Sequence, residues 1–86
     1  MSYSIAFNSE AIADLAKIDR PIQLWIARKI KWLGENFAEI IPIALTGNLA
    51  NYFKLRVGDY RVIYAIDQSS KSITIHQIGH RREIYD

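Results

Sequence analysis

The chain has 86 residues, 50% hydrophobic and 23% charged, which is typical of one globular domain and too short for two separate cores. It contains no cysteine, which excludes disulfides, a thiolate nucleophile and a cysteine-ligated zinc site and fits a reducing compartment. The net charge of +2 arises after residue 45, because residues 1–45 hold five basic and five acidic side chains and residues 46–86 hold six and four.

Targeting and membrane signals are not visible in the sequence. The first residues lack a basic segment followed by an apolar run, and no apolar stretch approaches the length of a membrane span. We therefore expect a single cytoplasmic domain over residues 1–86 that makes no contact with a membrane.

The first third of the chain predicts a strand followed by a helix. Residues 3–8 alternate in character, with Ile5 and Phe7 on one side, as in a short strand. Asn8 or Ser9 can cap a helix, whose apolar stripe is interrupted by Asp-Arg-Pro at positions 19–21.

A second helix is predicted from Pro21, which suits the first turn, to about Phe37. Its basic residues Arg28, Lys29 and Lys31 lie largely off the apolar stripe and are interpreted as a solvated face. The residues expected to face the core recur at helical spacing: Ile22, Trp25, Ile26, Ile30 and Leu33.

The C-terminal half predicts three strands at residues 51–57, 60–67 and 72–78. Pro42 and Gly47 mark the connection that leads to them, and residues 67–71 form the last turn. The order of elements predicts an α+β fold: an N-terminal strand, a helical hairpin and a three-stranded antiparallel meander.

The turn Gly58-Asp59 fixes the register of the first two strands of the meander. With a two-residue loop, Val57 pairs with Tyr60 and Arg56 pairs with Arg61. Lys54, Arg56 and Arg61 then share one face, because side chains alternate along a strand. Like charges directly across a ladder destabilise it by roughly 0.2–1 kcal/mol, so the arrangement is one that a polyanion-binding site would require.

The closing run, residues 79–85, adds His80, Arg81, Arg82 and Tyr85 to these cations. Two interpretations of the hairpin arginines are open: solvated strand residues whose stems cover apolar surface, or a phosphate-binding site. The basic tail favours the phosphate site. A metal site is poorly supported, since His76 and His80 are four apart on and just beyond a strand, and His76 is interpreted as a structural residue of the sheet.

RNA cleavage without a metal needs a base for the 2′-hydroxyl, cations for the phosphorane and an acid for the leaving 5′-oxygen. Arginine suits the non-bridging oxygens, and an aromatic ring can hold an unstacked base. The residues present can fill these roles, but their types alone do not fix which residue fills each.

The chain resembles the RelE/ParE superfamily of bacterial toxins, and the RelE branch more than the ParE branch. The resemblance covers nearly the whole chain and is carried by three motifs: Leu-Thr-Gly at residues 45–47, the hairpin at residues 52–64 and the His-Arg tail at residues 79–85.

The resemblance implies a type II toxin that cleaves mRNA in the ribosomal A site without a metal or other cofactor and leaves a 2′,3′-cyclic phosphate. Its expected partners are the ribosome, mRNA and a small RelB-like antitoxin that neutralises it in a hetero-oligomer. The implied catalytic residues are Lys54, Arg61, Arg81 and Tyr85, and the implied substrate-binding residues are Arg56, His80, Tyr52 and Arg82.

The chain departs from the family pattern in two places. Tyr52 stands where well-known members carry a second lysine, so Tyr52, His80 or Tyr85 would have to act as the general base. Asp86 follows Tyr85 directly, so we expect no substantial C-terminal helix. Two alternatives remain: a ParE-like inhibitor of DNA gyrase, and a non-catalytic relative that binds an antitoxin.

Overall fold

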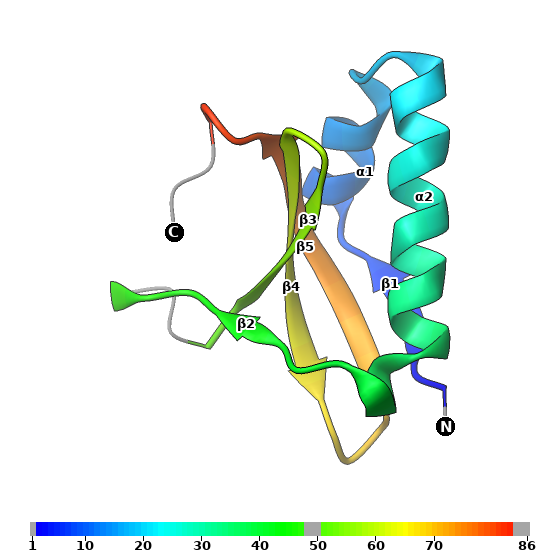
Figure 1. Cartoon of the computed structure of the whole chain (residues 1–86), viewed down its shortest axis with the longest axis vertical. Coiled ribbons are helices and arrows are strands. Elements are labelled where there is room, and N and C mark those ends of the chain that lie inside the picture. Colours follow the sequence, from blue (N-terminus) through cyan, green and yellow to red (C-terminus); the bar gives the residue numbers. More distant parts are fainter. Residues whose placement is uncertain (1, 48–50, 84–86) are drawn as a thin grey trace.

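A five-stranded sheet carries two helices on one of its faces in the computed structural model, which describes residues 2–47 and 51–83 (Figure 1). The strands and helices follow in this order: β1 Ser4–Phe7, α1 Ser9–Ala16, α2 Arg20–Glu35, β2 Ile43–Ala44, β3 Phe53–Val57, β4 Tyr60–Asp67 and β5 Ser72–His80. A short 3-10 helix, η1 Phe37–Glu39, leads from α2 towards β2. The predicted strand, helical hairpin and antiparallel meander are confirmed.

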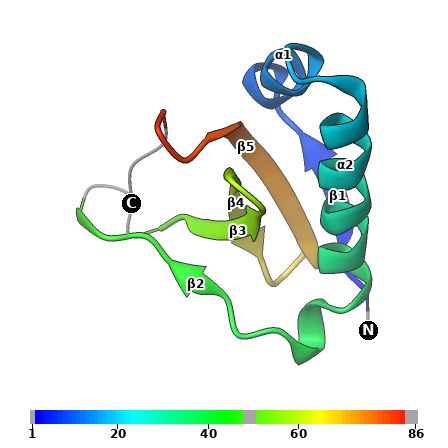
Figure 2. The same cartoon turned by 45° about the horizontal axis from the view of Figure 1, so that its top comes forward.

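The strands lie in the spatial order β1-β5-β4-β3-β2. The central pairs are antiparallel, whereas β1 runs parallel to β5, with Ile5 opposite Ile73. The two-residue β2 pairs with β3 and was not predicted, because its segment has no alternating pattern. Both helices cover the same face of the sheet, as the rotated view makes clear (Figure 2).

The helix boundaries follow from capping. The Asn8 side chain accepts a hydrogen bond from the Ala11 N–H at 2.9 Å, which confirms Asn8 as the N-cap of α1. Pro21 lies in the first turn of α2, as predicted. The helix ends at Glu35, two residues short of the predicted end, because the chain tightens into η1 at Phe37. None of the helices in the described ranges could cross a bilayer.

The core lies between the helices and the sheet. On α2, the side chains of Ile26, Ile30 and Leu33 are buried and Ile22 packs beside them. Trp25 differs from the prediction: it is 46% exposed, because its ring lies over the β3–β4 turn at Gly58 instead of entering the core. The sheet contributes the largest buried side chains on this side: Val57, Val62, Tyr64, Ile73 and Ile75.

The opposite side of the sheet, which we call the open face, carries Lys54, Arg56 and Arg61. These side chains alternate with Leu55 and Val57, which pack in the core. The open face also holds a small apolar cluster in which Tyr52 packs against Leu45 and Ile63. The open face is therefore a basic surface with an apolar patch beside it.

Candidate functional site

The β3–β4 hairpin places Arg56 directly opposite Arg61, which confirms the predicted register. The turn permits it because Gly58 adopts a φ of 58°, a conformation that side chains other than glycine rarely take. Lys54 pairs with Ile63 two rows further along and lies on the same face. Three cations therefore share the open face, and like charges placed this close favour the binding of an anion.

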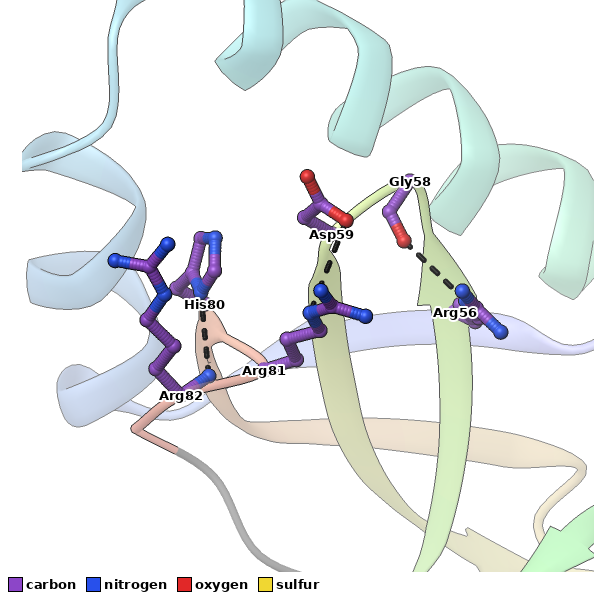
Figure 3. Close-up of polar contacts among 6 residues, drawn as sticks. All are labelled: Arg56, Gly58, Asp59, His80, Arg81 and Arg82. Atoms are coloured by element: carbon purple, nitrogen blue, oxygen red, sulfur yellow. Dashed lines mark hydrogen bonds and ion pairs between the residues drawn. The ribbon is translucent and has the colours of Figure 1, made fainter.

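Arg56 is held close to the turn by its own side chain. Its Nε donates a hydrogen bond to the Gly58 carbonyl oxygen at 3.3 Å (Figure 3). The residue is exposed, so this contact leaves part of the guanidinium group in solvent. The fixed fork of donors suits a phosphate, whose oxygens accept two hydrogen bonds at once.

The C-terminal run joins the hairpin through Asp59. β5 continues to His80, two residues beyond the predicted end, with Gly79 opposite Arg61. The Arg81 N–H then donates to the Asp59 carbonyl oxygen at 2.8 Å, and the Arg81 Nε lies 3.9 Å from the Asp59 carboxylate (Figure 3). The structure thus brings Arg81 to the same turn as Arg56. We call Lys54, Arg56, Arg61 and Arg81 the basic cluster.

Asp59, predicted only as a turn residue, also contributes a carboxylate to the site. Its carboxylate and the Arg81 side chain are 65% and 57% exposed, respectively, so the ion pair is weak and screened by water. The carboxylate nevertheless competes with any anion for Arg81. No motif in the sequence signals this contact, because it depends on where β5 ends.

His80 lies on the other side of the sheet from Lys54, Arg56 and Arg61. It pairs directly with Tyr60, whose side chain packs towards the core, and the two rings are edge to face at 5.4 Å. The His80 Nδ1 accepts a hydrogen bond from the Arg82 N–H at 3.2 Å (Figure 3). Arg82 is exposed just beyond β5. Strand alternation therefore separates His80 from the open face, and its role in substrate binding stays a prediction.

Tyr52 lies on the open face, two residues before Lys54 on the same chain segment. The segment continues the β2–β3 ladder, since the Leu45 N–H donates to the Tyr52 carbonyl oxygen at 2.9 Å. The Tyr52 ring meets the His76 ring edge to face at 4.9 Å. Tyr52 thus extends the basic cluster, whereas Tyr85 lies outside the described residues.

The site does not suggest a metal centre. In residues 2–47 and 51–83, no group of three histidine or acidic side chains is placed to hold a cation. His76 and His80 have different neighbours: His76 contacts Tyr52 and His80 contacts Tyr60. The described site is a surface of arginine, lysine and aromatic side chains.

Comparisons with known proteins agree with this architecture. Residues 5–85 match the family described as ParE toxin of type II toxin-antitoxin system, parDE. A protein named Toxin RelG from Mycobacterium tuberculosis is 31% identical over 88 aligned positions, which cover 99% of this chain and 98% of that protein.

Two solved structures show the same fold. The toxin–antitoxin complex RelBE2 from M. tuberculosis contains a chain with a TM-score of 0.84 and 27% identity, covering 94% of this chain and all of that one. A mutant of the Escherichia coli toxin RelE in the free state has a TM-score of 0.77 and 19% identity, covering 96% of this chain and 87% of that one. The predicted likeness to this superfamily is confirmed, and the chain belongs to the ParE toxin family of type II toxin–antitoxin systems, within the RelE/ParE superfamily.

Proposed function

We propose that this toxin is a ribosome-dependent endoribonuclease that cleaves mRNA in the A site. The observation that carries the proposal is the direct pairing of Arg56 with Arg61 on the open face, with Arg81 tied to the same turn. Repulsion between paired cations is a cost to folding, and an anionic substrate offsets it. A phosphodiester supplies the anion that these guanidinium groups fit best.

The basic cluster would act by electrostatic stabilisation. Attack of the 2′-hydroxyl on the adjacent phosphorus adds negative charge to the non-bridging oxygens, and Arg61 and Arg81 would stabilise that charge. Lys54 would contribute a further positive charge, and Arg56 would bind the neighbouring phosphate. The reaction breaks the bond to the 5′-oxygen and leaves a 2′,3′-cyclic phosphate, without a metal ion.

The general base is the least constrained role. Tyr52 shares the open face with Lys54, whereas His80 lies on the other side of the sheet beside Tyr60. This placement favours Tyr52 over His80 as a group near the scissile linkage. Tyr85 keeps the role that the family resemblance gives it, as a proton-transfer or base-orienting residue.

The test combines ribosomes programmed with a defined mRNA and a map of the cut sites by primer extension. We expect cuts in register with the reading frame. Arg61→Ala and Arg81→Ala should each lower the cleavage rate at least 100-fold, because each removes a cation that stabilises the charge of the transition state. Lys17→Ala, at the exposed C-cap of α1, is the matched control. A 2′-deoxynucleotide at the cut site should abolish cleavage, and undiminished cleavage by folded Arg61→Ala would refute the proposal.

Inhibition of DNA gyrase is the second candidate, because the matching family is described as ParE. A gyrase inhibitor would act through protein contacts and would leave mRNA intact. Supercoiling assays with purified gyrase separate the two activities directly. Inhibition of supercoiling without frame-dependent cuts would favour this candidate over the nuclease.

An antitoxin is the partner most strongly supported, since the chain belongs to a toxin–antitoxin family and the similar M. tuberculosis structure is a toxin–antitoxin complex. Two apolar grooves offer surfaces for it. One of about 390 Å³ is lined by Phe7, Ile12, Leu15, Ala16 and Gln23. Another of about 270 Å³ lies between α2, residues 40–43 and β3, and the 90%-exposed Ile41 lines it together with Lys54 and Arg56. An amphipathic antitoxin helix would cover such apolar surface.

A non-catalytic antitoxin-binding protein is the remaining alternative. It would bind its antitoxin tightly and cause no growth arrest when expressed alone. Growth arrest on induction, relieved by co-expression of the antitoxin, would exclude it.

A further inference from the structure

Beside the basic cluster, the open face carries a corner formed by two rings. The centroids of Tyr52 and His76 are 4.9 Å apart and their planes meet at 79°. Both side chains are half-buried, so each keeps some surface in contact with solvent. Tyr52 precedes Lys54 by two residues, which places it about 7 Å along the strand from that cation. The corner therefore adjoins the basic cluster.

His76 reaches this position because β5 contains a bulge. Ile63 pairs with Gln77 but the next residue, Tyr64, pairs with Ile75, so His76 is the extra residue. Burial shows the same break in alternation, because the spacing between buried residues changes from two (Ile73 to Ile75) to three (Ile75 to Ile78). A bulge redirects a side chain and is frequent beside functional sites.

Asn8 fixes the orientation of the His76 ring. The Asn8 Oδ1 accepts the Ala11 N–H as the cap of α1, so the atom 3.2 Å from the His76 Nδ1 is the amide nitrogen Nδ2. An amide NH₂ group can only donate, and therefore Nδ1 accepts. In the neutral imidazole the proton then resides on Nε2, for which the described residues provide no hydrogen-bond partner. His76 thus holds a pre-oriented Nε2–H donor.

We propose that Tyr52 and His76 bind a nucleobase of the RNA, with the base stacked against the corner and the His76 Nε2–H donating to an acceptor on its edge. This inference rests on the proposed nuclease function and adds a base subsite to it. Stacking accepts any base, because every base has a π-face. The donor favours bases with exposed acceptors, above all guanine with its adjacent O6 and N7.

The first test is a nuclear magnetic resonance titration of the full chain with 2′-O-methyl trinucleotides that differ only in the central base and cannot be cleaved. We expect Tyr52→Ala to weaken binding at least fivefold for all four bases, in line with the loss of one stacking contact. His76→Phe keeps a ring but lacks the donor, so it should lose the preference for guanine. Tyr52→Phe keeps the stacking surface, so it should recover the affinity that Tyr52→Ala loses. Lys17→Ala, at the exposed C-cap of α1, is the control and should bind like the wild type.

The second test determines the tautomer of the His76 imidazole directly. Long-range ¹⁵N spectra should show the Nε2–H tautomer in the wild type. Asn8→Ser keeps a good helix cap but removes the amide donor, so the tautomers should become mixed and the guanine preference should fall.

The outcomes separate this inference from the function on which it rests. If Tyr52→Ala and His76→Phe fold and keep the wild-type affinity and order of base preference, the base subsite is overturned. The nuclease proposal is unaffected by that result as long as Arg61→Ala loses binding. An Nδ1–H tautomer in the wild type would also overturn it. Absence of any response of the wild type to millimolar trinucleotide would overturn the subsite together with direct RNA recognition by this surface.

Discussion

Asp59 places a carboxylate among the guanidinium groups of the basic cluster. Its position 3.9 Å from the Arg81 Nε lowers the positive potential that a phosphate would meet. Both side chains are largely exposed, so the pair contributes little to stability. Its main consequence is a competition between an internal carboxylate and an external anion for the same arginine.

We predict that Asp59→Asn leaves the free energy of unfolding within about 0.5 kcal/mol of the wild type. The main-chain carbonyl of residue 59 still accepts the Arg81 N–H, so the tail should stay in place. Affinity for the uncleavable trinucleotides should rise by ~2–5-fold, the equivalent of a surface ion pair, with a steeper dependence on salt. Glu39→Gln makes the same charge change in η1 and should have no such effect. Weaker binding by Asp59→Asn would show that the carboxylate helps to bind the substrate.

Gly58 illustrates a residue with two separate requirements. Its φ of 58° disfavours a side chain, and an added Cβ would lie 2.7 Å from the Cη2 of Trp25. Gly47 has a φ of 65° but no described atom within 4 Å of the position that a Cβ would occupy. Comparing substitutions at Gly47 and Gly58 therefore separates the stability cost of backbone strain from that of steric overlap.

Gly47→Ala should accordingly cost about 1–2 kcal/mol of unfolding free energy, the strain of a left-handed non-glycine residue. Gly58→Ala should cost ~1–3 kcal/mol more, because the Trp25 ring must move. Urea denaturation of both variants, repeated in a Trp25→Ala background, measures the two contributions. The excess cost at residue 58 should disappear in that background; an excess that persists would show that the ring contact is unimportant.

At the scale of elements, α2 and β1 approach unusually closely at Gly34. The Tyr3 N–H donates to the Gly34 carbonyl oxygen at 2.8 Å, and a Cβ on residue 34 would lie 2.8 Å from the Tyr3 carbonyl oxygen. The nearest atom is main chain and cannot turn away as a flexible side chain would. The close packing of α2 against Tyr3 therefore requires a residue without a side chain at position 34.

Gly34→Ala is predicted to destabilise the protein by roughly 1–3 kcal/mol, as expected for overpacking. This sign is the reverse of the effect in an exposed helix, where replacing glycine by alanine gains about 1 kcal/mol. Lys31→Ala, on the exposed side of the same helix, should change stability by no more than about 0.5 kcal/mol. Thermal or urea unfolding measures both, and a stabilised Gly34→Ala would contradict the close approach of α2 to β1.

The elements show which parts of the fold the sequence could predict. The hairpin register was predictable because a two-residue turn with glycine at its first position leaves one pairing of Arg56 and Arg61. The bulge at His76 was not, since one extra residue in an apolar strand has no local signature, and the structural role given to His76 overlooked its position next to Tyr52. Trp25 fits the helical stripe, but its contact with Gly58 depends on how α2 crosses the sheet. The face occupied by His80 likewise depends on β5 continuing past Ile78.

The whole molecule divides its functions between the two sides of one sheet. The side under the helices supplies stability through a buried apolar core, whereas the open face holds Arg56 directly opposite Arg61. The hairpin residues connect the two, because Leu55 and Val57 pack in the core while Lys54 and Arg56 point away from it. Substitutions on the open face should therefore alter activity with small effects on stability, and substitutions in the core should do the reverse.

Titration of Tyr64 tests this division, because Tyr64 is the largest fully buried side chain of the core and its phenol can ionise. Burial raises the pKa of Tyr64 to about 12, above the value of 10.0 that it has in water. Between these two values the unfolded chain loses the phenolic proton while the folded protein keeps it, so stability must fall as the pH rises from about 10 towards 12. A pKa raised from 10.0 to about 12 corresponds to a loss of roughly 2–3 kcal/mol of unfolding free energy.

Tyr64→Phe removes the titrating group and keeps the ring that packs between Phe37 and Phe53. We predict that the difference in unfolding free energy between wild type and Tyr64→Phe is constant from pH 7 to 9 and shifts in favour of the variant above pH 10. Urea unfolding as a function of pH measures this difference and cancels the titration of lysine and arginine, which both proteins share. Parallel pH profiles up to pH 12 would mean that the hydroxyl of Tyr64 reaches water in the folded state, and the core would then be open at its centre.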